Sequence, residues 1–305
     1  MRIAILGAGA MGCLFGGYLS RLHDVWLIDT DQSKIDAIRE NGVTIQESDG
    51  DRVFHPKAVF DTSTLEPMDL ILVFVKAMFS REALANNRHL IGSRTYLLSL
   101  QNGAGHEEVL GEFVGLERVV LGTTQHNSSL KMPGKIHHGG GGTTCIGSLV
   151  TDGSALEPIA AAFRACGIET AVTADIQKQI WAKLFLNASA SALTAVLQVR
   201  LGYIAENAHA WLLATRLIRE AVAVANANRL DFDPAQVTAD IRKILINARE
   251  GITSICADIR DGRRTEVDTI SGSVVRKAKQ LGLPVPTHEF VVECIHALEQ
   301  RTHNL

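Results

Sequence analysis

A glycine-rich hexapeptide, Gly7-Ala8-Gly9-Ala10-Met11-Gly12, limits what this 305-residue chain can fold into more than any other feature of its sequence. It follows an apolar segment at residues 2–6 and leads into an amphipathic segment at residues 10–21. A G-x-G-x-x-G pattern between a strand and a helix is typical of the first turn of a Rossmann fold. We therefore expect an N-terminal dinucleotide-binding domain.

The positions of this motif have distinct roles in such a turn. Gly7 would make the tight turn, Gly9 would let the backbone approach a pyrophosphate, and Gly12 would let the helix pack against the strand. The helix N-terminus, at Ala10 and Met11, offers N–H groups and partial positive charge to the phosphates. We predict that these five residues bind the cofactor; the alternative is a tight turn that binds no ligand.

Asp29 follows the second predicted strand, at residues 25–28. A carboxylate at this position accepts hydrogen bonds from the adenosine ribose hydroxyls and repels a 2′-phosphate, and Thr30 beside it adds no positive charge. We therefore expect NAD(P)H as the cofactor, with NADH favoured over NADPH. The alternative is that Asp29 only caps the strand end while Lys34 or Arg39 binds a phosphate.

The first half of the chain alternates short apolar runs with helical patterns, which favours parallel strands joined by crossover helices in an α/β, doubly wound sheet. Predicted strands lie at residues 2–6, 25–28, 70–75, 95–100 and 119–122, and predicted helices at residues 10–21 and 33–40, the second capped by Asp31 or Ser33. After Lys131, a Pro-Gly pair, the glycine run 139–142 and a short strand at 143–146 predict a hairpin that caps the sheet edge. We assign residues 1–174 to this Rossmann domain.

The second half of the chain loses its strand patterns and has apolar residues at helical spacing. Predicted helices lie at residues 176–197, 205–228, 234–248, 269–281 and 287–298. Asp233-Pro234 is a cap followed by proline in the first turn, and Gly282 is a C-cap. We assign residues 175–305 to an all-helical substrate and catalytic domain.

Composition excludes several classes of function. The formal net charge is −3 without basic runs, so we expect no nucleic-acid partner. The five cysteines are scattered without metal-ligand spacing, which indicates a reducing compartment and no metal site. The longest apolar run, residues 70–75, is far too short to span a membrane, and no targeting segment precedes the first strand. We expect a cytoplasmic protein with no membrane partner.

Polar residues at two strand ends and on one helical face are candidates for chemistry. Lys76 and Asn102 each follow a predicted strand, at the sheet edge where open α/β sheets bind ligands. Lys183 and Asn187 are four residues apart and share a helical face, with Ser191 one turn further along. A lysine whose pKa burial has lowered toward neutrality could protonate a carbonyl oxygen as hydride arrives.

Several motifs along nearly the whole chain resemble those of the ketopantoate reductases. The similar stretches are the glycine motif, Val75-Lys76-Ala77, Gln101-Asn102-Gly103, Pro133-Gly134 leading into residues 139–147, residues 181–187, and residues 253–254 through Asp258 to residues 264–268. The resemblance implies a Rossmann domain followed by a helical domain. It also implies hydride transfer from NAD(P)H to C2 of a small branched 2-oxo acid, 2-dehydropantoate or a close analogue.

The resemblance further implies roles for individual residues. Lys183 matches the family's catalytic lysine, the proton donor to the ketone oxygen, and Glu266 matches the acid that positions lysine and substrate. Lys76 and Asn102 match residues at the ribose and nicotinamide end of the cofactor.

Asn187 and Ser254 match substrate-binding positions, Ser254 toward the carboxylate of the 2-oxo acid. Asp258 matches a family acid whose role is not separable from helix structure.

Two positions depart from the family pattern. Ser191 replaces the asparagine that in many members touches the distal hydroxyl of the substrate, so ketopantoate itself is in question. Asp29-Thr30 replaces the basic residue that NADPH-dependent members have after the second strand. Both departures suit the NAD-dependent D-2-hydroxyacid (D-mandelate type) dehydrogenases, which are the alternative function.

Other interpretations remain open for several features. A 3-hydroxyacid dehydrogenase would carry an Asp-x-Pro-Val-Ser-Gly-Gly segment that is not present, and a non-catalytic redox sensor would not need Lys183, Glu266 and Ser254 together.

The arginines at 260, 263 and 264 are either surface charges paired with nearby acids or a carboxylate anchor. His137-His138 cannot bind one metal ion from a regular strand, because adjacent side chains point to opposite faces. The alanine-rich helices could pack within the domain or across a homodimer.

Overall fold

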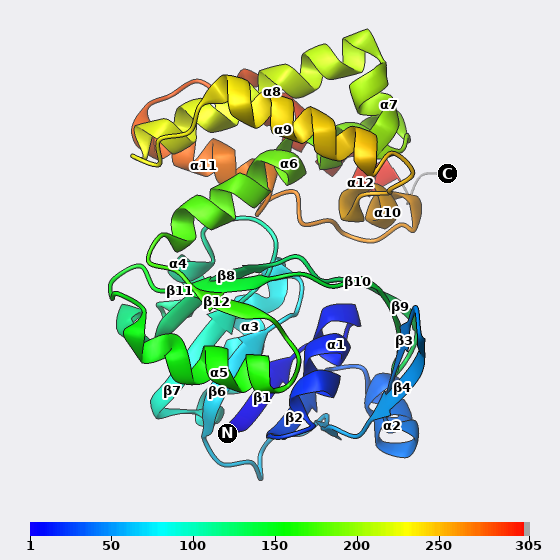
Figure 1. The fold of residues 1–305 in the computed structure, drawn as a ribbon, viewed down its shortest axis with the longest axis vertical. Helices are drawn as coiled ribbons and strands as arrows, with labels where there is room; N and C mark the ends of the chain where they lie inside the picture. The colour runs from blue at the N-terminus through cyan, green and yellow to red at the C-terminus, as the bar shows by residue number, and fades with distance from the viewer. Residues whose placement is uncertain (302–305) are drawn as a thin grey trace. The chain divides into compact units, whose positions relative to one another are not determined.

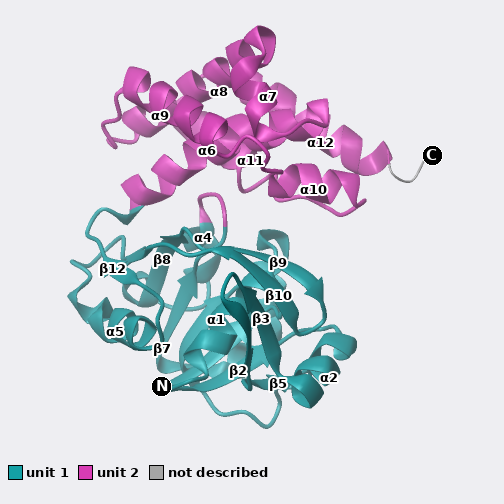
Figure 2. Cartoon of the chain, turned by 45° about the vertical axis from the view of Figure 1, so that its right-hand side comes forward, with its two compact units in different colours: residues 1–101, 106–176 teal, residues 102–105, 177–305 magenta. Residues whose placement is uncertain are grey.

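A computed structural model describes residues 1–301 and divides the chain into two compact units (Figure 2). The N-terminal unit comprises residues 1–101 and 106–176, and the helical unit comprises residues 102–105 and the chain from residue 177. The boundary predicted from the sequence is instead a single one, after residue 174. Ile176 packs on Gly147 of the N-terminal unit, and the N–H of Ala104 donates to the carbonyl of Thr269, 3.0 Å away, in the helical unit.

An eight-stranded sheet forms the centre of the N-terminal unit, in the order β12-β11-β8-β7-β6-β1-β2-β5 (Figure 1). All neighbouring pairs are parallel except β11 with β8. The strands are β1 (Arg2–Leu6), β2 (Asp24–Ile28), β5 (Lys57–Val59), β6 (Met68–Val73), β7 (Ile91–Ser99), β8 (Val119–Thr124), β11 (Thr144–Gly147) and β12 (Thr170–Val172). The central strands are buried along nearly their whole length because parallel sheets are covered on both faces, and this produces the apolar runs in the sequence.

The helices of the N-terminal unit are short. They are α1 (Ala10–Leu19), α2 (Gln32–Asn41), α3 (Ser80–Asn86), α4 (His106–Leu110) and α5 (Glu157–Ala165), with 3-10 turns at Ala77–Phe79, Arg88–Leu90, Leu116–Arg118 and Ser154–Leu156. The carboxylate of Asp31 accepts the N–H of Ser33 at 3.0 Å and caps α2, as one of the two predicted caps. Helix α1 ends two residues before the predicted end, where the N–H of Arg21 bonds the carbonyl of Tyr18, three residues back, instead of a carbonyl four residues back.

A second sheet, absent from the sequence prediction, lies beside α1. Its order is β4-β3-β10-β9, formed by β3 (Val43–Glu47), β4 (Gly50–Phe54), β9 (Asn127–Met132) and β10 (Lys135–Gly140). The predicted hairpin is therefore only partly right. It turns at Gly134, where φ is +71°, and pairs with β3 rather than with the large sheet, whereas the predicted strand at 143–146 is present as β11 in the large sheet. Of the glycine run 139–142, the first two residues end β10 and the last two lead toward β11.

Two glycines of α1 let this helix fit between the two sheets. A Cβ on Gly16 would lie 2.7 Å from Cδ2 of Leu27 in β2, and a Cβ on Gly17 would lie 3.0 Å from Cδ1 of Ile45 in β3. Real Cβ atoms essentially never approach a neighbour closer than 3.0 Å, and contacts up to 3.4 Å are rare. Helix α1 is thus packed closely against both the large and the small sheet.

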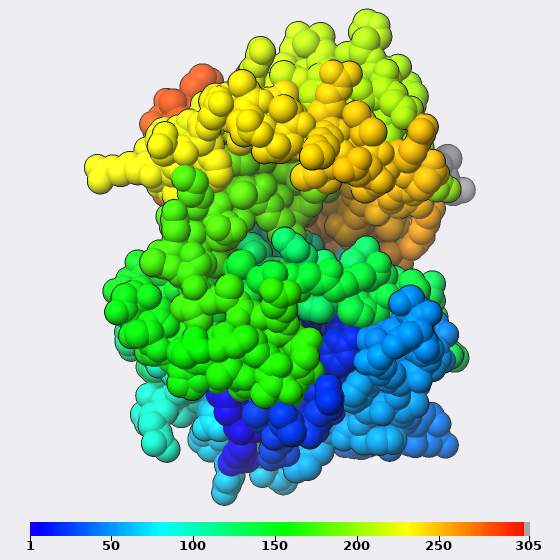
Figure 3. Space-filling model, in the orientation of Figure 1, coloured from blue at the N-terminus to red at the C-terminus, as the bar shows by residue number. Residues whose placement is uncertain are grey.

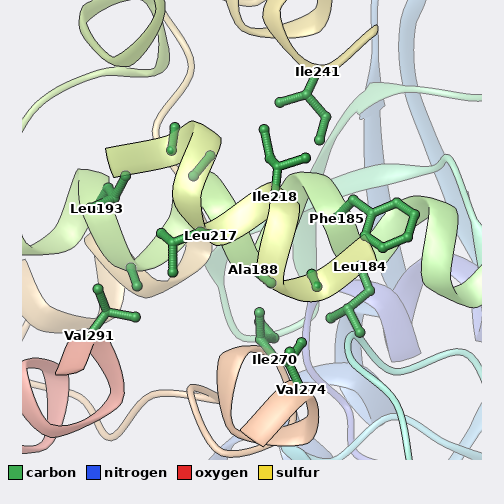
Figure 4. Packing of buried hydrophobic residues seen from close by; sticks show 14 of the residues in the cluster. Leu184, Phe185, Ala188, Leu193, Leu217, Ile218, Ile241, Ile270, Val274 and Val291 are labelled. Carbon is green, nitrogen blue, oxygen red and sulfur yellow. The ribbon is translucent and has the colours of Figure 1, made fainter. Parts of the chain in front are cut away.

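The helical unit packs around one long central helix. Its helices are α6 (Ile176–Leu197), α7 (Leu201–Glu206), α8 (Ala208–Ala227), α9 (Pro234–Asn247), α10 (Ser254–Arg260), α11 (Ser271–Leu281) and α12 (Pro286–Arg301). Leu184, Phe185 and Ala188 of α6 lie among apolar side chains of α8, α9 and α11 (Figure 4).

The predicted helix ends in this unit are partly confirmed. Asp233 caps α9, since its Oδ1 accepts the N–H of Ala235 at 2.9 Å, and Gly282 ends α11 with φ at +68°. The predicted helix 205–228 is two helices, because the Asn207 side chain accepts the N–H groups of His209 and Ala210 and begins α8. Helix α10 is not predicted from the sequence.

Helix α6 is also long and apolar enough to cross a membrane, by length and composition alone. Its most apolar window has a mean hydropathy of 1.4, and 67% of that window is buried. The core helix of a compact unit has the same properties, so the observation is weak evidence for a membrane span.

Candidate active site

The turn after β1 has the geometry of a dinucleotide-binding turn. Gly7 has φ at +105°, and its N–H donates to the carbonyl of Ile28 at 2.7 Å. A Cβ on Gly7 would lie 2.8 Å from the backbone N of Val75, and a Cβ on Gly12 would lie 1.9 Å from the carbonyl oxygen of Gly7. Only glycine fits these two positions, because the clashing atoms belong to the backbone and cannot move aside.

Gly9 differs from its two neighbours in the motif. A Cβ there would have no protein atom within 4 Å, so its backbone faces open space. Gly9 is also the N-cap of α1, no side chain caps that helix, and its first turn, which includes Ala10 and Met11, contains no acid. An uncapped helix N-terminus that faces open space fits a pyrophosphate, which would satisfy the N–H groups and the positive end of the helix dipole.

A pocket of about 350 Å³ adjoins this turn in the N-terminal unit. Its lining residues come from the ends of β1 and β2 and from two later segments: Leu6, Gly7, Ile28, Asp29, Thr30, Phe60, Asp61, Thr62, Val75, Ala83, Asn86 and Asn87. Phe60 is half exposed there, and an exposed phenyl ring can stack on a purine. The volume lies within the range of pockets that bind small ligands, and its position beside Gly7 fits the adenosine half of a dinucleotide.

Asp29 is joined to the glycine turn directly. Its Oδ2 accepts the N–H of Ala8 at 2.8 Å, and its Oδ1 accepts the N–H of Asp31 at 2.9 Å. Lys34 pairs with this carboxylate at 3.2 Å, so the alternative phosphate ligand from the sequence is already bound to Asp29. Arg39 is engaged elsewhere, because its Nε donates to the carbonyl of Ala58 at 2.8 Å.

Lys76 and Asn102 belong to different units. Lys76 lies three residues beyond β6, is half-buried and precedes the 3-10 turn at Ala77–Phe79. Asn102 is half-buried and begins the segment that groups with the helical unit. The Gln101 side chain, to which the sequence motif assigned no role, donates to the carbonyl of Val75 at 2.6 Å and so joins the segment after β6 to the segment after β7.

Lys183 and Glu266 come together in the helical unit, although 83 positions separate them in the sequence. Burial lowers the pKa of Lys183 from 10.5 to about 8, and the nearby charge of Glu266 acts in the opposite direction. At this pKa the lysine is largely protonated at neutral pH and can still release its proton. A lysine in this state can act as a general acid.

The loop that carries Glu266 is fixed on both sides. Thr265 and Val267 are buried, and the N–H of Thr265 donates to Oε1 of Glu299 at 2.7 Å. The carbonyl of Glu266 accepts the N–H groups of Thr269 and Ile270, each at 3.1 Å. The backbone at Glu266 is therefore held by packing and hydrogen bonds in a loop without regular secondary structure.

The three predicted substrate-binding side chains share one property. Within residues 1–301, the side chains of Asn187, Ser191 and Ser254 make no hydrogen bond to another residue. Ser191 is 3% exposed, Asn187 is half-buried, and Ser254 is exposed in the first turn of α10. By contrast, the hydroxyls of Thr194 and Thr253, close to them in the sequence, are bonded to protein atoms. The unpaired groups are therefore available to a ligand.

Two of the three arginines at the end of α10 and just after it pair with acids, as one of the two predictions states for the three. Arg263 bonds Oδ1 of Asp258 at 2.8 Å and pairs with Asp261, and Arg260 also pairs with Asp261. Asp258 is buried, so its contact with Arg263 offsets the cost of burying a carboxylate.

His137 and His138 point to different environments. His137 is exposed, and Nε2 of half-buried His138 lies 3.0 Å from Nδ1 of His126. In the described part of the chain, no three His, Cys, Asp or Glu side chains form a group that could hold a metal ion.

A second pocket, of about 760 Å³, lies between α8 and α9 of the helical unit and contains no predicted site residue. It is lined by Trp211, Thr215, Arg219, Pro234, Ala235, Thr238, Ala239, Arg242, Lys243, Ile246 and Asn247. Helix α9 lies on the surface of its unit, in yellow to gold in Figure 3. The volume of a pocket alone therefore does not locate the chemistry in this unit.

Comparison with known proteins agrees with the two-unit organisation. Family models described as ketopantoate reductase PanE/ApbA and ketopantoate reductase PanE/ApbA C terminal match residues 3–150 and 175–299. The 2-dehydropantoate 2-reductase of Halobacterium salinarum is 32% identical over 305 residues, 99% of each chain, and that of Pyrococcus abyssi is 35% identical over 290 residues, 94% of each chain.

Solved structures are similar over the full length. D-mandelate dehydrogenase with NADH and anilino(oxo)acetate has a TM-score of 0.92 at 28% identity and covers 100% of both chains. A PanE/ApbA family ketopantoate reductase from Ralstonia eutropha has a TM-score of 0.91 at 28% identity, covering 99% of this chain and 100% of its own.

A Rossmann-type unit with a dinucleotide turn, followed by a helical unit with a half-buried lysine of lowered pKa, defines an NAD(P)-dependent oxidoreductase that acts on a CH–OH group or its ketone. Within that class, the chain belongs to the ketopantoate reductase family. The resemblance stated from the sequence and the predicted fold class are both confirmed.

Proposed function

We propose that this protein reduces a small branched 2-oxo acid at C2, 2-dehydropantoate or a close analogue, and that Lys183 is the general acid. One observation carries the proposal: Asn187, Ser191 and Ser254 have no hydrogen-bond partner within residues 1–301, in the unit that holds a lysine with a pKa of about 8. Polar groups that no protein atom pairs with are available to polar atoms of a ligand, and the cost of leaving them without a partner is greatest for the more buried Ser191 and Asn187.

Each residue of the proposed site has a separate role in the reaction. When bound, NAD(P)H supplies the hydride that adds to C2. Lys183 Nζ gives one proton to the ketone oxygen, so that the ketone becomes a hydroxyl and the lysine becomes neutral. Glu266 favours the protonated lysine before the transfer. Ser254 and Asn187 hold the carboxylate and the polar groups of the substrate, while Lys76 and Asn102 contact the ribose and nicotinamide end of the cofactor.

We propose that NADH is preferred over NADPH. Of the described residues that line the 350 Å³ pocket, two are acidic, Asp29 and Asp61, and none is lysine or arginine. The cation nearest Asp29, Lys34, already pairs with that carboxylate. A 2′-phosphate next to Thr30 would therefore meet carboxylates but no cation in the pocket lining that could pair with it, whereas ribose hydroxyls could donate to the Asp29 carboxylate.

A second candidate function is an NAD-dependent D-2-hydroxyacid dehydrogenase of the D-mandelate type. The similarity to D-mandelate dehydrogenase with NADH supports it, as does the short, buried side chain of Ser191, where a longer amide would reach a distal substrate hydroxyl. The same residues would serve both reactions, since the oxidation of a 2-hydroxy acid is the reverse of the reduction.

Initial rates test the proposed substrate class and the proposed cofactor preference. They are measured with NADH and with NADPH for each of four acids: ketopantoate, 2-oxoisovalerate, 2-oxoisocaproate and benzoylformate. We expect higher kcat/KM with NADH for every productive acid. A preference for ketopantoate supports the reductase, and a preference for benzoylformate supports the dehydrogenase. No turnover with any of the four acids, despite cofactor binding, would contradict both.

We further propose a cytoplasmic homodimer that contacts no nucleic acid or membrane. Exposed apolar side chains gather on α7, α8 and α9, at Tyr203, Leu212, Leu213, Ile244 and Ile246, and a partner subunit could cover them. Light scattering after size exclusion measures the mass, and fractionation of cells measures the location. A monomer in dilute buffer would contradict the dimer.

A further inference from the structure

Two threonine hydroxyls form a buried link between two helices of the helical unit. Thr194 lies on α6 and is fully buried, and Thr253 is the N-cap of α10. Their Oγ1 atoms are 2.8 Å apart, across 59 positions of sequence. Thr194 lies outside the motifs noted in the sequence, and Thr253 lies within one but was given no role there.

The hydrogen bonds of this link have one consistent direction. Thr194 Oγ1 lies 3.0 Å from the carbonyl of Ser191, which can only accept, so the Thr194 hydroxyl donates to it. Thr253 Oγ1 accepts the N–H of Cys256 at 3.3 Å. Each hydroxyl has a single proton, so Thr253 must donate to Thr194. The chain of bonds therefore runs from the first turn of α10, through both hydroxyls, to the backbone of Ser191.

Both ends of this link adjoin residues of the proposed substrate site. Ser191 supplies the accepting carbonyl at one end, and Ser254 follows Thr253 at the other. Within residues 1–301, the side chains of Ser191 and Ser254 have no partner of their own that would fix them. Helix α10 has only seven residues, so its start is fixed largely by its cap and by its packing.

The second bond of Thr194 distinguishes it from other helical threonines in this unit. Thr215 and Thr238 each bond only a carbonyl of their own helix, at 2.8 and 2.7 Å. That is the common pattern for threonine within a helix. A hydroxyl with no exposed surface that reaches another helix sets the register between the two, because its hydrogen bond is directional and apolar contacts are not.

We propose that Thr194 is a positioning residue for substrate binding. Through its hydrogen bond to Thr253, it fixes the position of Ser254 relative to Ser191. This inference rests on the proposed function, in which Ser254 binds the substrate carboxylate. Removing the Thr194 hydroxyl leaves the Thr253 cap intact, since Thr253 Oγ1 still accepts the N–H of Cys256. It releases the start of α10 from α6 and so displaces Ser254.

The test is a double-mutant cycle between Thr194→Val and Ser254→Ala, measured with NADH and the best 2-oxo acid. We expect each single variant to raise the KM for the 2-oxo acid about tenfold, with the KM for NADH and kcat changed less than about twofold. We expect the double variant to resemble Ser254→Ala alone, because Thr194 acts through Ser254. Thr194→Ser, which keeps the hydroxyl, should restore the KM.

Controls separate positioning from general loss of structure. Thr215→Val removes a hydroxyl that bonds only its own helix, and it should leave the KM unchanged. If Thr194→Val does not fold, Thr194→Ala also lacks the hydroxyl and cannot overpack the site. Thermal unfolding of each variant shows whether a KM change follows stability instead.

The outcomes are distinct. If Ser254→Ala leaves the KM unchanged, the proposed carboxylate site fails, and the role of Thr194 fails with it. If Ser254→Ala raises the KM but Thr194→Val does not, only the role of Thr194 fails. If the two effects multiply in the double variant, Thr194 acts independently of Ser254, which also overturns the inference.

Discussion

The carboxylate of Glu220 on α8 contacts two nitrogen atoms of His288: its Oε2 lies 3.0 Å from both the backbone N and the ring Nδ1. Its other oxygen accepts the N–H of Thr287 at 3.0 Å. Glu220 thus caps the first turn of α12 from a different helix. Burial opposes the ionisation of Glu220, but the bonds from His288 and Thr287 outweigh it and lower its pKa to about 2.

Glu220→Gln should destabilise the protein by about 1–3 kcal/mol at pH 7, because the amide cannot accept three bonds as a charged group does. The pKa of Glu220 is lowered on folding, so its contribution is complete above about pH 4.5 and is lost as the pH falls toward 2. Chemical denaturation at several pH values should show the variant and wild type converging in acid. Glu250→Gln, at an exposed ion pair with Arg200, is the control and should change stability by less than about 1 kcal/mol.

The rate of ketone reduction should fall as the pH rises through about 8, because the general acid must be protonated and burial lowers the pKa of Lys183 to that value. Oxidation of the hydroxy acid should show the opposite dependence, since the neutral lysine then accepts the proton. Lys183→Ala should lower kcat by about 10²–10⁴ and leave the Kd for NADH unchanged. Lys178→Ala, on the same helix, should affect neither, and an unaltered pH profile in Lys183→Ala would remove Lys183 from the mechanism.

Glu266→Gln should move the alkaline limb of that profile to lower pH. The charge of Glu266 raises the pKa of Lys183 against the effect of burial, so removing the charge lowers the pKa further. At pH 8 the variant should lose more activity than at pH 6. A proportional loss at every pH would mean that Glu266 does not act through the protonation of Lys183.

Two glycine variants should separate folding from cofactor binding. Gly12→Ala places a Cβ 1.9 Å from the carbonyl oxygen of Gly7, so it should lower the melting temperature and NADH affinity together. The Cβ added by Gly9→Ala has no protein atom within 4 Å, so this variant should leave the melting temperature unchanged. It should weaken NADH binding at least about tenfold, because the Cβ would fill the space for the pyrophosphate. Isothermal titration and thermal unfolding measure the two effects. Unchanged NADH affinity in Gly9→Ala would place the pyrophosphate elsewhere.

Asp29→Asn should reduce the preference for NADH over NADPH. The amide oxygen can still accept the N–H of Ala8, so the turn is retained. Lys34 loses its closer carboxylate and keeps only the longer contact with Asp31, at 3.9 Å, so it becomes more available to a 2′-phosphate. We expect the ratio of kcat/KM values for the two cofactors to change about tenfold or more toward NADPH. The double variant Asp29→Asn/Lys34→Gln should lose much of this gain, and an unchanged ratio in Asp29→Asn would contradict the assigned role.

The sequence predicts those parts of the fold that local patterns specify. The buried strands β1, β2 and β6 are continuous apolar runs, and Asp233 and Gly282 mark helix ends by their own chemistry. Strand β4 was missed because its residues are mostly polar and exposed. Strand β3 was missed because it has only two buried apolar residues, Val43 and Ile45, and one of its two partner strands, β10, lies far along the chain.

The candidate site shows the same division. The glycine turn and Asp29 follow from local spacing, and the structure joins them through the Ala8 N–H. The proximity of Lys183 and Glu266 entered only through resemblance to a family, because no local pattern links residues so far apart. The roles of Gln101, Thr194 and Thr253 depend entirely on tertiary hydrogen bonds, so composition and periodicity contain no trace of them.

The position of Gly16 and Gly17 between two sheets has a consequence for cofactor binding at the opposite end of the same helix. Because Gly16 and Gly17 pack closely against Leu27 and Ile45, we expect α1 to move little when a ligand binds. Its N-terminal amides would then be preorganised for a phosphate, without an induced rearrangement of the helix. The absence of side chains at two positions near the end of α1 would thereby affect how precisely its N-terminus is placed.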